Sequence, residues 1–517
     1  MPANVVSYVP RIGCVAPPDR ASSCFNHVEG GRVVITRRQT LHKLVLGAAV
    51  MFAASVPGTR AIAQPRPQRR EVSGLPMNDP ILETLRDGVR ILQNRQPGQG
   101  PTWTDMANIH GTDQGFNKCP HGNWYFLPWH RAYVRMYEQM IRSITSNAAF
   151  AMPYWDWAAN RAVPQAFSQP TYNGAQNPLY VADRRNDYRV PDIYAGPEVM
   201  ADIYGQRNFE LFATSRPRGQ TDLNPAWIKR GGVQGTLERT PHNNIHNDLK
   251  GWMPTTRSPM DPIFQMHHAN IDRIWWQWNA RGGVNTSETL WRDMPFTDNY
   301  YNPDGTMATY RPADLLDVEA LGYSYGAQPR RVGSGLRTRA DVRLATIFRV
   351  GRAASANVPG TERLIFQETP FALGIEGAAA VRGSNLSRAL GEGGSGAPPP
   401  PPPLMRGSEG PSQVVALIHN LTPPTDDVEV LVFAGTGALP EATDVSSPNF
   451  VTSIGFFGGG GHNHEGISAS VDLTQHLRTL PARSDEVHVR LVARPKAGGN
   501  ASVQETVARA EVEVVIV

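Results

Sequence analysis

Three features are scarce in this sequence: blocks of basic residues, long apolar runs and cysteines. The net charge is only +4 over 517 residues, with no basic block, so the electrostatic footprint of a nucleic-acid-binding protein is missing. The apolar run at residues 44–56 is shorter than the roughly 20 residues that a membrane-spanning helix needs. We therefore expect neither a nucleic-acid ligand nor stable membrane insertion of the mature form. A hydrophobic content of 40% and a charged content of 19% instead indicate a globular protein with a buried core.

Residues 1–63 have the pattern of an export leader. Arg37 and Arg38 precede the apolar run, and small residues at positions 61 and 63 form a cleavage pattern. The paired arginines resemble a twin-arginine signal, although Thr40 stands where a phenylalanine often follows them. We therefore predict export to the periplasm or secretion. The alternative is that the apolar run forms a buried helix.

Cysteine occurs three times, and two of these residues, Cys14 and Cys24, fall within the predicted leader. Cys119 is then the only cysteine of the mature chain. A disulfide within one mature chain is excluded, despite the oxidising destination of an exported protein. A solitary cysteine in such a protein calls for a chemical role or a buried structural one.

Residues 78–326 are rich in tryptophan, tyrosine, methionine and histidine. Apolar side chains recur there at three- and four-residue spacing, as one buried face of a helix does. Two segments show this spacing: Tyr133, Tyr137, Met140, Ile141 and Ile144, and then Ile271, Ile274, Trp275 and Trp278. We predict a mainly α domain over residues 78–326, a helical bundle with long irregular connections.

The composition changes after about residue 327. Residues 327–341 are rich in glycine and arginine and predict an exposed linker. Residues 342–517 contain short runs of β-branched residues, some alternating with polar ones, which favour strands. We predict strands over Val342–Val350, Val414–Ile418, Val428–Phe433, Val487–Val492 and Val512–Val517. These runs favour an all-β sandwich, with a proline-rich surface loop at residues 391–410.

Histidines gather in two clusters within the predicted α domain. The first contains His110, His121 and His130, and the second contains His242, His246 and the adjacent pair His267 and His268. The spacing of four residues between His242 and His246 projects both imidazoles from one helix face, where they can bind the same ion.

Acidic residues follow both clusters at helical spacing. Glu138 lies eight residues after His130, and Asp272 lies four residues after His268. A ligand histidine usually donates its second ring N–H to an acceptor that orients it. We therefore predict that Glu138 and Asp272 are these acceptors.

The type of ligand narrows the choice of metal. Imidazole suits zinc, copper, iron and nickel, whereas magnesium and calcium need oxygen ligands. Two all-histidine groups without an obvious bridging carboxylate argue against a binuclear hydrolase, and nitrogen-rich sites favour copper.

Two segments resemble a known family. The pattern His121-x4-Phe126-Leu127-x-Trp129-His130-Arg131 is similar to the first copper signature of tyrosinases, catechol oxidases and hemocyanins. The pattern Asp261-Pro262-x-Phe264-x3-His268-x3-Asp272 is similar to the second signature, with Gln265 at a place that is usually apolar. Residues 153–157 and 321–325 also resemble the family, and residues 449–495 more loosely resemble the shielding C-terminal domain of plant-type members.

The resemblance implies an enzyme that holds two copper ions and uses dioxygen to oxidise small phenolic substrates to o-quinones. It assigns His110, His121 and His130 to one copper and His242, His246 and His268 to the other, and the matching pattern favours His268 over His267. It also implies a thioether between Cys119 and His121. A simple buried thiol is the alternative for this cysteine.

Two polar residues bear on the reaction. Glu238 lies four residues before His242, and Asn243 directly follows it. In family members that hydroxylate monophenols, a glutamate and an asparagine at these places are thought to hold a water that deprotonates the phenol. A phenol with a pKa of about 10 needs such a base at neutral pH. The alternative for either residue is a structural capping role. We predict a tyrosinase; the alternatives are a catechol oxidase or an oxygen-carrying hemocyanin-like protein.

The two-part layout predicts a latent enzyme. In plant-type relatives, a side chain of the C-terminal domain enters the substrate pocket. Phe456 and Phe457 are the candidates here, because an aromatic ring mimics a phenol and the neighbouring glycines permit a protruding turn. The alternative places both rings in the sandwich core. The arginine-rich linker from Arg330 to Arg339 is the expected site of activating cleavage.

Overall fold

The computed structural model describes residues 66–96, 98–327, 339–355, 362–365, 378–382, 413–422, 428–437, 439, 444–457, 466–480, 486–496 and 510–517. All of them belong to one compact unit, Arg66–Val517. The predicted leader, the proline-rich loop and residues 330–338 of the arginine-rich linker lie outside the described residues. Within the described ranges, no helix is both long enough and apolar enough to cross a bilayer.

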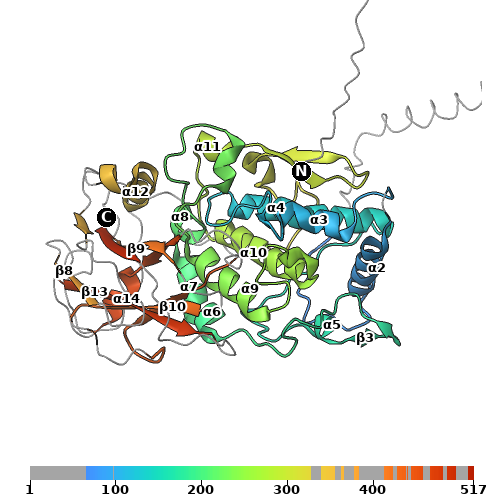
Figure 1. Ribbon diagram of the computed structural model, residues 1–517, viewed down its shortest axis with the longest axis horizontal. Coiled ribbons are helices and arrows are strands. Elements are labelled where there is room, and N and C mark those ends of the chain that lie inside the picture. The colour runs from blue at the N-terminus through green and yellow to red at the C-terminus, as the bar shows by residue number, and fades with distance from the viewer. Residues whose placement is uncertain are drawn as a thin grey trace, which may run out of the picture. The chain divides into compact units, whose positions relative to one another are not determined.

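The first half of the described chain is helical (Figure 1). Its two long helices, α4 (Phe126–Ile144) and α10 (Ile263–Ala280), pack against each other, and α2 (Pro80–Asn94) packs on α4. The apolar faces predicted for α4 and α10 lie in one large core, which confirms the helical prediction. Shorter helices occupy the connections: α3 (Trp103–His110), α5 (Gln165–Ser168), α6 (Asp192–Ala195), α7 (Pro197–Gly205), α8 (Phe209–Phe212), α9 (Asn243–Leu249) and α11 (Thr289–Arg292).

Three small antiparallel hairpins complete this half. They pair β1 (Gly111–Thr112) with β2 (Gly115–Phe116), β3 (Thr171–Tyr172) with β4 (Ala175–Gln176), and β5 (Phe296–Tyr301) with β6 (Met307–Tyr310).

The start of α3 is fixed by a capping box. The Thr102 hydroxyl accepts a hydrogen bond from the Asp105 backbone N–H at 3.0 Å, and the Asp105 carboxylate accepts one from the Thr102 N–H at 3.0 Å. The helix ends at His110, and the chain then enters the β1–β2 hairpin. The first predicted ligand therefore lies at the last position of a helix whose start is fixed by its local sequence.

The C-terminal half contains a β-sandwich, as the sequence predicts. One sheet has the strand order β11-β10-β13-β8, the other has the order β12-β9-β14-β7, and all strand pairs are antiparallel. A hydrophobic core distinct from that of the helical half lies in the sandwich. The strands are β7 (Glu362–Ile365), β8 (Ala378–Arg382), β9 (Val414–Leu421), β10 (Val428–Gly435), β11 (Phe450–Ile454), β12 (Ile467–Asp472), β13 (Glu486–Pro495) and β14 (Glu511–Ile516), with helix α14 (Thr474–Thr479) between β12 and β13.

One predicted strand is wrong. Val342–Val350 lies within helix α12 (Arg339–Ser355), which also takes in the end of the predicted linker. Buried Ala340, Leu344, Ile347 and Phe348 recur at helical spacing and pack against Leu211 and the outward face of β9 and β14. The β-branched residues in this segment favoured a strand, but the helical period of its apolar residues agrees with the structure.

Candidate metal centre

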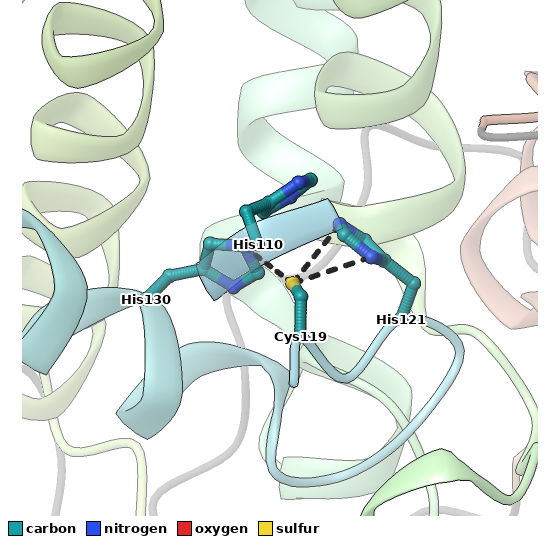
Figure 2. Close-up of side chains that lie close together, drawn as sticks. All are labelled: His110, Cys119, His121 and His130. Carbon is teal, nitrogen blue, oxygen red and sulfur yellow. Dashed lines mark hydrogen bonds between the residues drawn. The ribbon is translucent and has the colours of Figure 1, made fainter. Parts of the chain in front are cut away.

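The first histidine group is formed by His110, His121 and His130, together with Cys119. His110 ends α3 and His130 lies near the start of α4, while Cys119 and His121 lie in the loop between the two helices. One potential ligand atom of each residue lies within 4.8 Å of those of the others. Figure 2 shows the four side chains converging. Since the ring centroids of His110 and His130 each lie 5.2 Å from that of His121, the three imidazoles can bind one ion.

The second group contains His242, His246, His267 and His268. His242 ends a π-helical turn, η2 (Glu238–His242), which α9 continues directly, so His242 and His246 project from one helical segment. The other two histidines come from α10. The Nε2 atoms of His246 and His268 are 3.1 Å apart. Ligand atoms of all four residues again lie within 4.8 Å of one another, so this group can also bind an ion.

The two groups adjoin each other. The rings of His130 and His268 stack with centroids 4.3 Å apart, and those of His121 and His242 are 5.6 Å apart. His268 thus contacts both groups, whereas the His267 ring packs against His242 and Trp157. This arrangement favours His268 over His267 as the third ligand of a binuclear centre.

Hydrogen bonds at Nδ1 fix the orientation of four of the predicted ligands. Backbone carbonyls of Thr256, Phe126 and Met253 accept from His110, His130 and His246 at 2.6, 2.8 and 2.8 Å, and the Asn243 Oδ1 accepts from His242 at 2.8 Å. With the proton held on Nδ1, Nε2 presents its lone pair to the centre. The Nε2 atoms of His110 and His242 are buried and have no hydrogen-bond partner in the described part of the chain. These unpartnered nitrogens fit a pair of metal ions.

The protonation state also suits metal binding. Burial lowers the pKa of His110 and of His242 to about 3. Burial, followed by the proximity of other histidines, lowers the pKa of His121 and His268 as well. The imidazoles are therefore neutral at neutral pH, which is the form that binds a metal.

The prediction that Glu138 and Asp272 accept hydrogen bonds from ligand histidines is wrong. Glu138 accepts from Arg69 at 2.8 Å, from Arg142 at 2.8 Å and from the Met152 N–H at 2.9 Å. The Phe126 carbonyl serves His130 instead, because it lies closer to Nδ1 than a side chain two turns away. Nδ1 of His268 has no hydrogen-bond partner within the described part of the chain.

Asp272 belongs to the same ionic cluster. It accepts hydrogen bonds from Arg131, from Arg69 at 3.0 Å, and from the Tyr323 and Tyr325 hydroxyls at 2.7 and 2.6 Å. Burial alone raises the pKa of Asp272, but the two arginines hold it below its ordinary value. Arg69 therefore ties Glu138 on α4 to Asp272 on α10, the helices that carry His130 and His268. Sequence reasoning missed Arg69, which precedes the predicted domain and belongs to no recognisable motif.

This cluster predicts a large loss of stability in Asp272→Asn. The substitution keeps the side-chain volume but removes a counter-charge from two fully buried guanidinium groups, so the free energy of unfolding should fall by about 3–5 kcal/mol. Urea denaturation of the copper-free chain, followed by fluorescence, measures the change. Asp87→Asn is the control, because Asp87 forms an exposed ion pair with Arg90 at 2.6 Å, and such pairs contribute about 1 kcal/mol or less. Equal denaturation midpoints for the two variants would contradict the prediction.

Cys119 is buried between two predicted ligands (Figure 2). Its sulfur lies 3.4 and 3.9 Å from the two ring nitrogens of His121, and so near the carbon that joins them, and 3.2 Å from His130 Nε2. Burial raises the pKa of the Cys119 thiol, which keeps it protonated at neutral pH.

Glu238 and Asn243 are both buried at the edge of the centre. One carboxyl oxygen of Glu238 accepts from the Gly122 N–H at 2.6 Å, and the other accepts from the Thr214 hydroxyl. Burial raises the pKa of Glu238 to about 8. Asn243 contacts the His242 ring through its oxygen, and its backbone N–H caps the end of η2. Both residues therefore make structural hydrogen bonds, although neither side chain caps the start of its own helix.

The structure separates the two predicted pocket-blocking phenylalanines. Phe456 is 2% exposed and belongs to the sandwich core, so its predicted blocking role is wrong. The Phe457 ring lies over the histidines, with its centroid 4.1 Å from that of His246, 4.8 Å from that of His121 and 5.4 Å from that of His242.

Residues Thr452–Phe457, which we call the plug segment, are held to the helical half by buried hydrogen bonds. Arg239 donates to the Thr452 hydroxyl at 2.9 Å, and its carbonyl accepts from the Gly455 N–H at 2.8 Å. The Asn243 amide donates to the Gly455 carbonyl at 2.9 Å, and Asn247 donates to the Phe456 carbonyl. The plug segment therefore contacts the helical segment that carries His242 and His246.

Known proteins are similar to this chain in both sequence and fold. Residues 101–281 match the family described as the common central domain of tyrosinase. Tyrosinase HcTyr1 of Hahella sp. (strain CCB-MM4) is 32% identical over 297 residues, covering 48% of this chain and 61% of the relative. The chloroplastic polyphenol oxidase of Malus domestica is 27% identical over 300 residues, covering 51% and 48%. The alignments thus span less than two thirds of the length of these relatives.

Solved structures extend the likeness over most of the chain. Latent apple tyrosinase has a TM-score of 0.62 and 19% identity, covering 87% of this chain and 97% of that one. Latent aurone synthase from its natural source has a TM-score of 0.59 and 18% identity, with coverage of 87% and 90%. At these identities the likeness shows the fold: a helical half followed by a β-domain.

Proposed function

Through its central domain the chain belongs to the tyrosinase and polyphenol oxidase family, and we propose that it oxidises small phenols to o-quinones with two copper ions and dioxygen. The proposal rests on the pair of adjoining histidine groups, in which the Nε2 atoms of His110 and His242 are buried and unpartnered within the described part of the chain. His110, His121 and His130 would hold one copper, and His242, His246 and His268 the other. Copper bound there supplies the binding and reduction of dioxygen. The purified, activated chain should contain two copper ions and consume dioxygen when catechol is added.

The chain's own residues hold the ligands and shape a site for an aromatic ring. Four Nδ1 hydrogen bonds orient the imidazoles before any metal binds, which lowers the cost of ordering them. The Phe457 ring indicates where a phenol would lie, against His246 and 5.7 Å from the Phe116 ring. Burial around this ring keeps water away from the reacting hydroxyl.

We further infer that Glu238 and Asn243 support monophenol hydroxylation, which makes the enzyme a tyrosinase. The support is their position: Asn243 contacts the His242 ring, and Glu238 bonds the backbone next to His121. Burial raises the pKa of Glu238 to about 8, so its carboxylate, once ionised, is a stronger base than that of an ordinary glutamate. A water between these residues and the substrate would pass the phenol proton to Glu238.

Glu238→Gln, made in the Phe457→Ala background so that substrate can reach the centre, tests this role. The substitution keeps the hydrogen-bonding shape but removes the base, so monophenol hydroxylation should fall by roughly 10²-fold or more. Diphenol oxidation should change far less. Both rates are measured on matched substrates, tyramine and dopamine. Equal losses on the two substrates would show that Glu238 only supports the metal site.

One observation favours a catechol oxidase as the second candidate. Both donors of the Asn243 amide are occupied, by Gln234 at 3.1 Å and by the Gly455 carbonyl, and both Glu238 oxygens already accept hydrogen bonds. If these bonds persist after the plug ring is removed, a base water finds no open partner. Diphenol oxidation without any hydroxylation of tyramine would then be observed.

The Cys119–His121 thioether is a further proposal. Joining sulfur to the ring carbon breaks one S–H and one C–H bond and releases two protons and two electrons. Copper and dioxygen bound at the centre would accept these electrons. Peptide mass spectrometry of copper-loaded protein should show a linked pair lighter by two hydrogens, whereas protein expressed without copper should show free Cys119. The proposal would be contradicted if enzyme that is fully active is then denatured and its Cys119 alkylates completely.

A further inference from the structure

A hollow lies at the opposite end of α3 from the metal centre. It has a volume of about 350 Å³ and is bounded by the end of α2, the start of α3 and the segments around Tyr180 and Trp252. Trp103, at the first position of α3, forms one wall, and His110, in the metal centre, ends the same helix. Seven helical steps separate them by about 10 Å. The hollow is therefore separate from the space that Phe457 occupies.

The walls of this hollow combine aromatic, aliphatic and polar side chains, three of each kind. Trp103, Tyr180 and Trp252 line it, together with the thioether of Met260. Trp252 is 37% exposed, which is high for so large an apolar side chain. The Arg257 guanidinium lies 4.9 Å from the centroid of its ring, a cation–π contact that restrains the ring. A ligand that stacks on Trp252 therefore meets a surface that is already ordered.

Most polar groups of the hollow are available to a ligand. The Thr102 hydroxyl is bound to Asp105, whereas the side chains of Gln93, Thr104 and Tyr180 make no hydrogen bond within the described part of the chain. No lysine, arginine, aspartate or glutamate is among the lining residues. Small-molecule sites typically combine apolar walls with a few such polar groups in a volume of about 300–1,000 Å³. The chemistry fits a neutral, planar ligand that carries hydroxyl groups.

We propose that this hollow binds a neutral monocyclic phenol at a site distinct from the metal centre. The ring stacks on Trp252 beside Tyr180, and the hydroxyl group bonds to Gln93 or Thr104. The proposal takes the ring chemistry of its ligand from the proposed function, but binding here requires no copper. An enzyme with such a site retains phenol near the metal centre while the plug segment is closed.

Titration of copper-free, full-length protein with 4-fluorophenol, followed by fluorine NMR, tests the proposal. Phe457 covers the metal centre in this form, so the expected Kd, on the order of 1 mM for a ligand of this size, reports the hollow. Trp252→Ala should weaken binding at least tenfold. Tyr180→Phe keeps the ring and should have a smaller effect. Leu223→Ala, at a position that is also 37% exposed, should leave the Kd unchanged.

Two outcomes would overturn the proposal. One is a Kd unaffected by Trp252→Ala, and the other is tighter binding of methyl glucoside than of 4-fluorophenol, which would make the hollow a sugar site. His242→Ala, in the metal centre, should leave fluorophenol binding intact. Because the titration contains no copper, a failure of the copper-oxidase proposal would appear in metal content and oxygen uptake and would leave this result unchanged.

Discussion

Replacing His268 with alanine is expected to abolish catechol oxidation and to remove one tightly held copper. The Nε2 atom of His268 lies 3.1 Å from that of His246, and its ring stacks on His130 of the other group. The variant leaves two imidazoles where three converge and removes the stacking of His268 on His130 between the two groups. Loss of an outer hydrogen-bond partner reduces affinity or activity roughly 10–100-fold. Loss of a ligand should exceed this range in both copper content and oxygen uptake.

His267→Ala is the matched control. His267 neighbours His268 in α10, is equally buried, and has its ring centroid 5.3 Å from that of His268. Its removal leaves a cavity of the same size but should preserve two coppers and most of the turnover. Circular dichroism confirms that both variants fold. If His267→Ala loses the copper and His268→Ala keeps it, the ligand assignment is reversed.

The metal centre could be predicted from sequence because its ligands occupy specific motifs at helical spacing. Their approach in space could not be predicted, because it depends on α4 packing against α10. The role of Asp272 was misassigned for the same reason. Its position one turn after His268 indicated a partner for that ring, but Arg69 and Arg131 reach it from elements far away in the sequence. A charge held by distant residues leaves no local pattern.

The two phenylalanines show a different limit. In extended chain, adjacent side chains point to opposite sides, so one of Phe456 and Phe457 must enter the sandwich core and the other must leave it. The sequence does not say which of the two enters the core, because both residues are phenylalanine. The register between β10 and β11, in which Val430 pairs with Ile454, fixes the direction of the chain just before this pair.

The plug segment carries the second large prediction: Phe457→Ala should raise the diphenol oxidation rate of the intact chain roughly tenfold or more. A ring tethered over the histidines competes with substrate at an effective concentration of millimolar or above, so phenol at lower concentration is excluded. The substitution removes the ring but keeps the backbone bonds that Arg239 and Asn247 make to the plug segment. The catechol rate of the intact variant, compared with that of the intact parent, measures the effect.

Gly455→Ala should activate the enzyme by a different route. A Cβ at this position would lie 2.3 Å from the Asn244 Oδ1 and 2.9 Å from its backbone nitrogen, so the plug segment has to move away from α9. Gly437→Ala is the control, because a Cβ there meets no atom within 4 Å. Phe456→Ala is unsuitable, since deleting a core ring should cost the sandwich about 3–5 kcal/mol.

Proteolysis provides an independent way to remove Phe457 from the metal centre. Trypsin should cut between Arg330 and Arg339, but the buried bonds from Arg239 and Asn243 to the plug segment do not depend on the linker. Cleavage alone should therefore leave the sandwich bound, and activity should rise to the Phe457→Ala level only in fractions from which gel filtration has removed the sandwich. An intact parent as active as Phe457→Ala, or a nicked complex as active as the isolated helical half, would show that Phe457 does not block the centre.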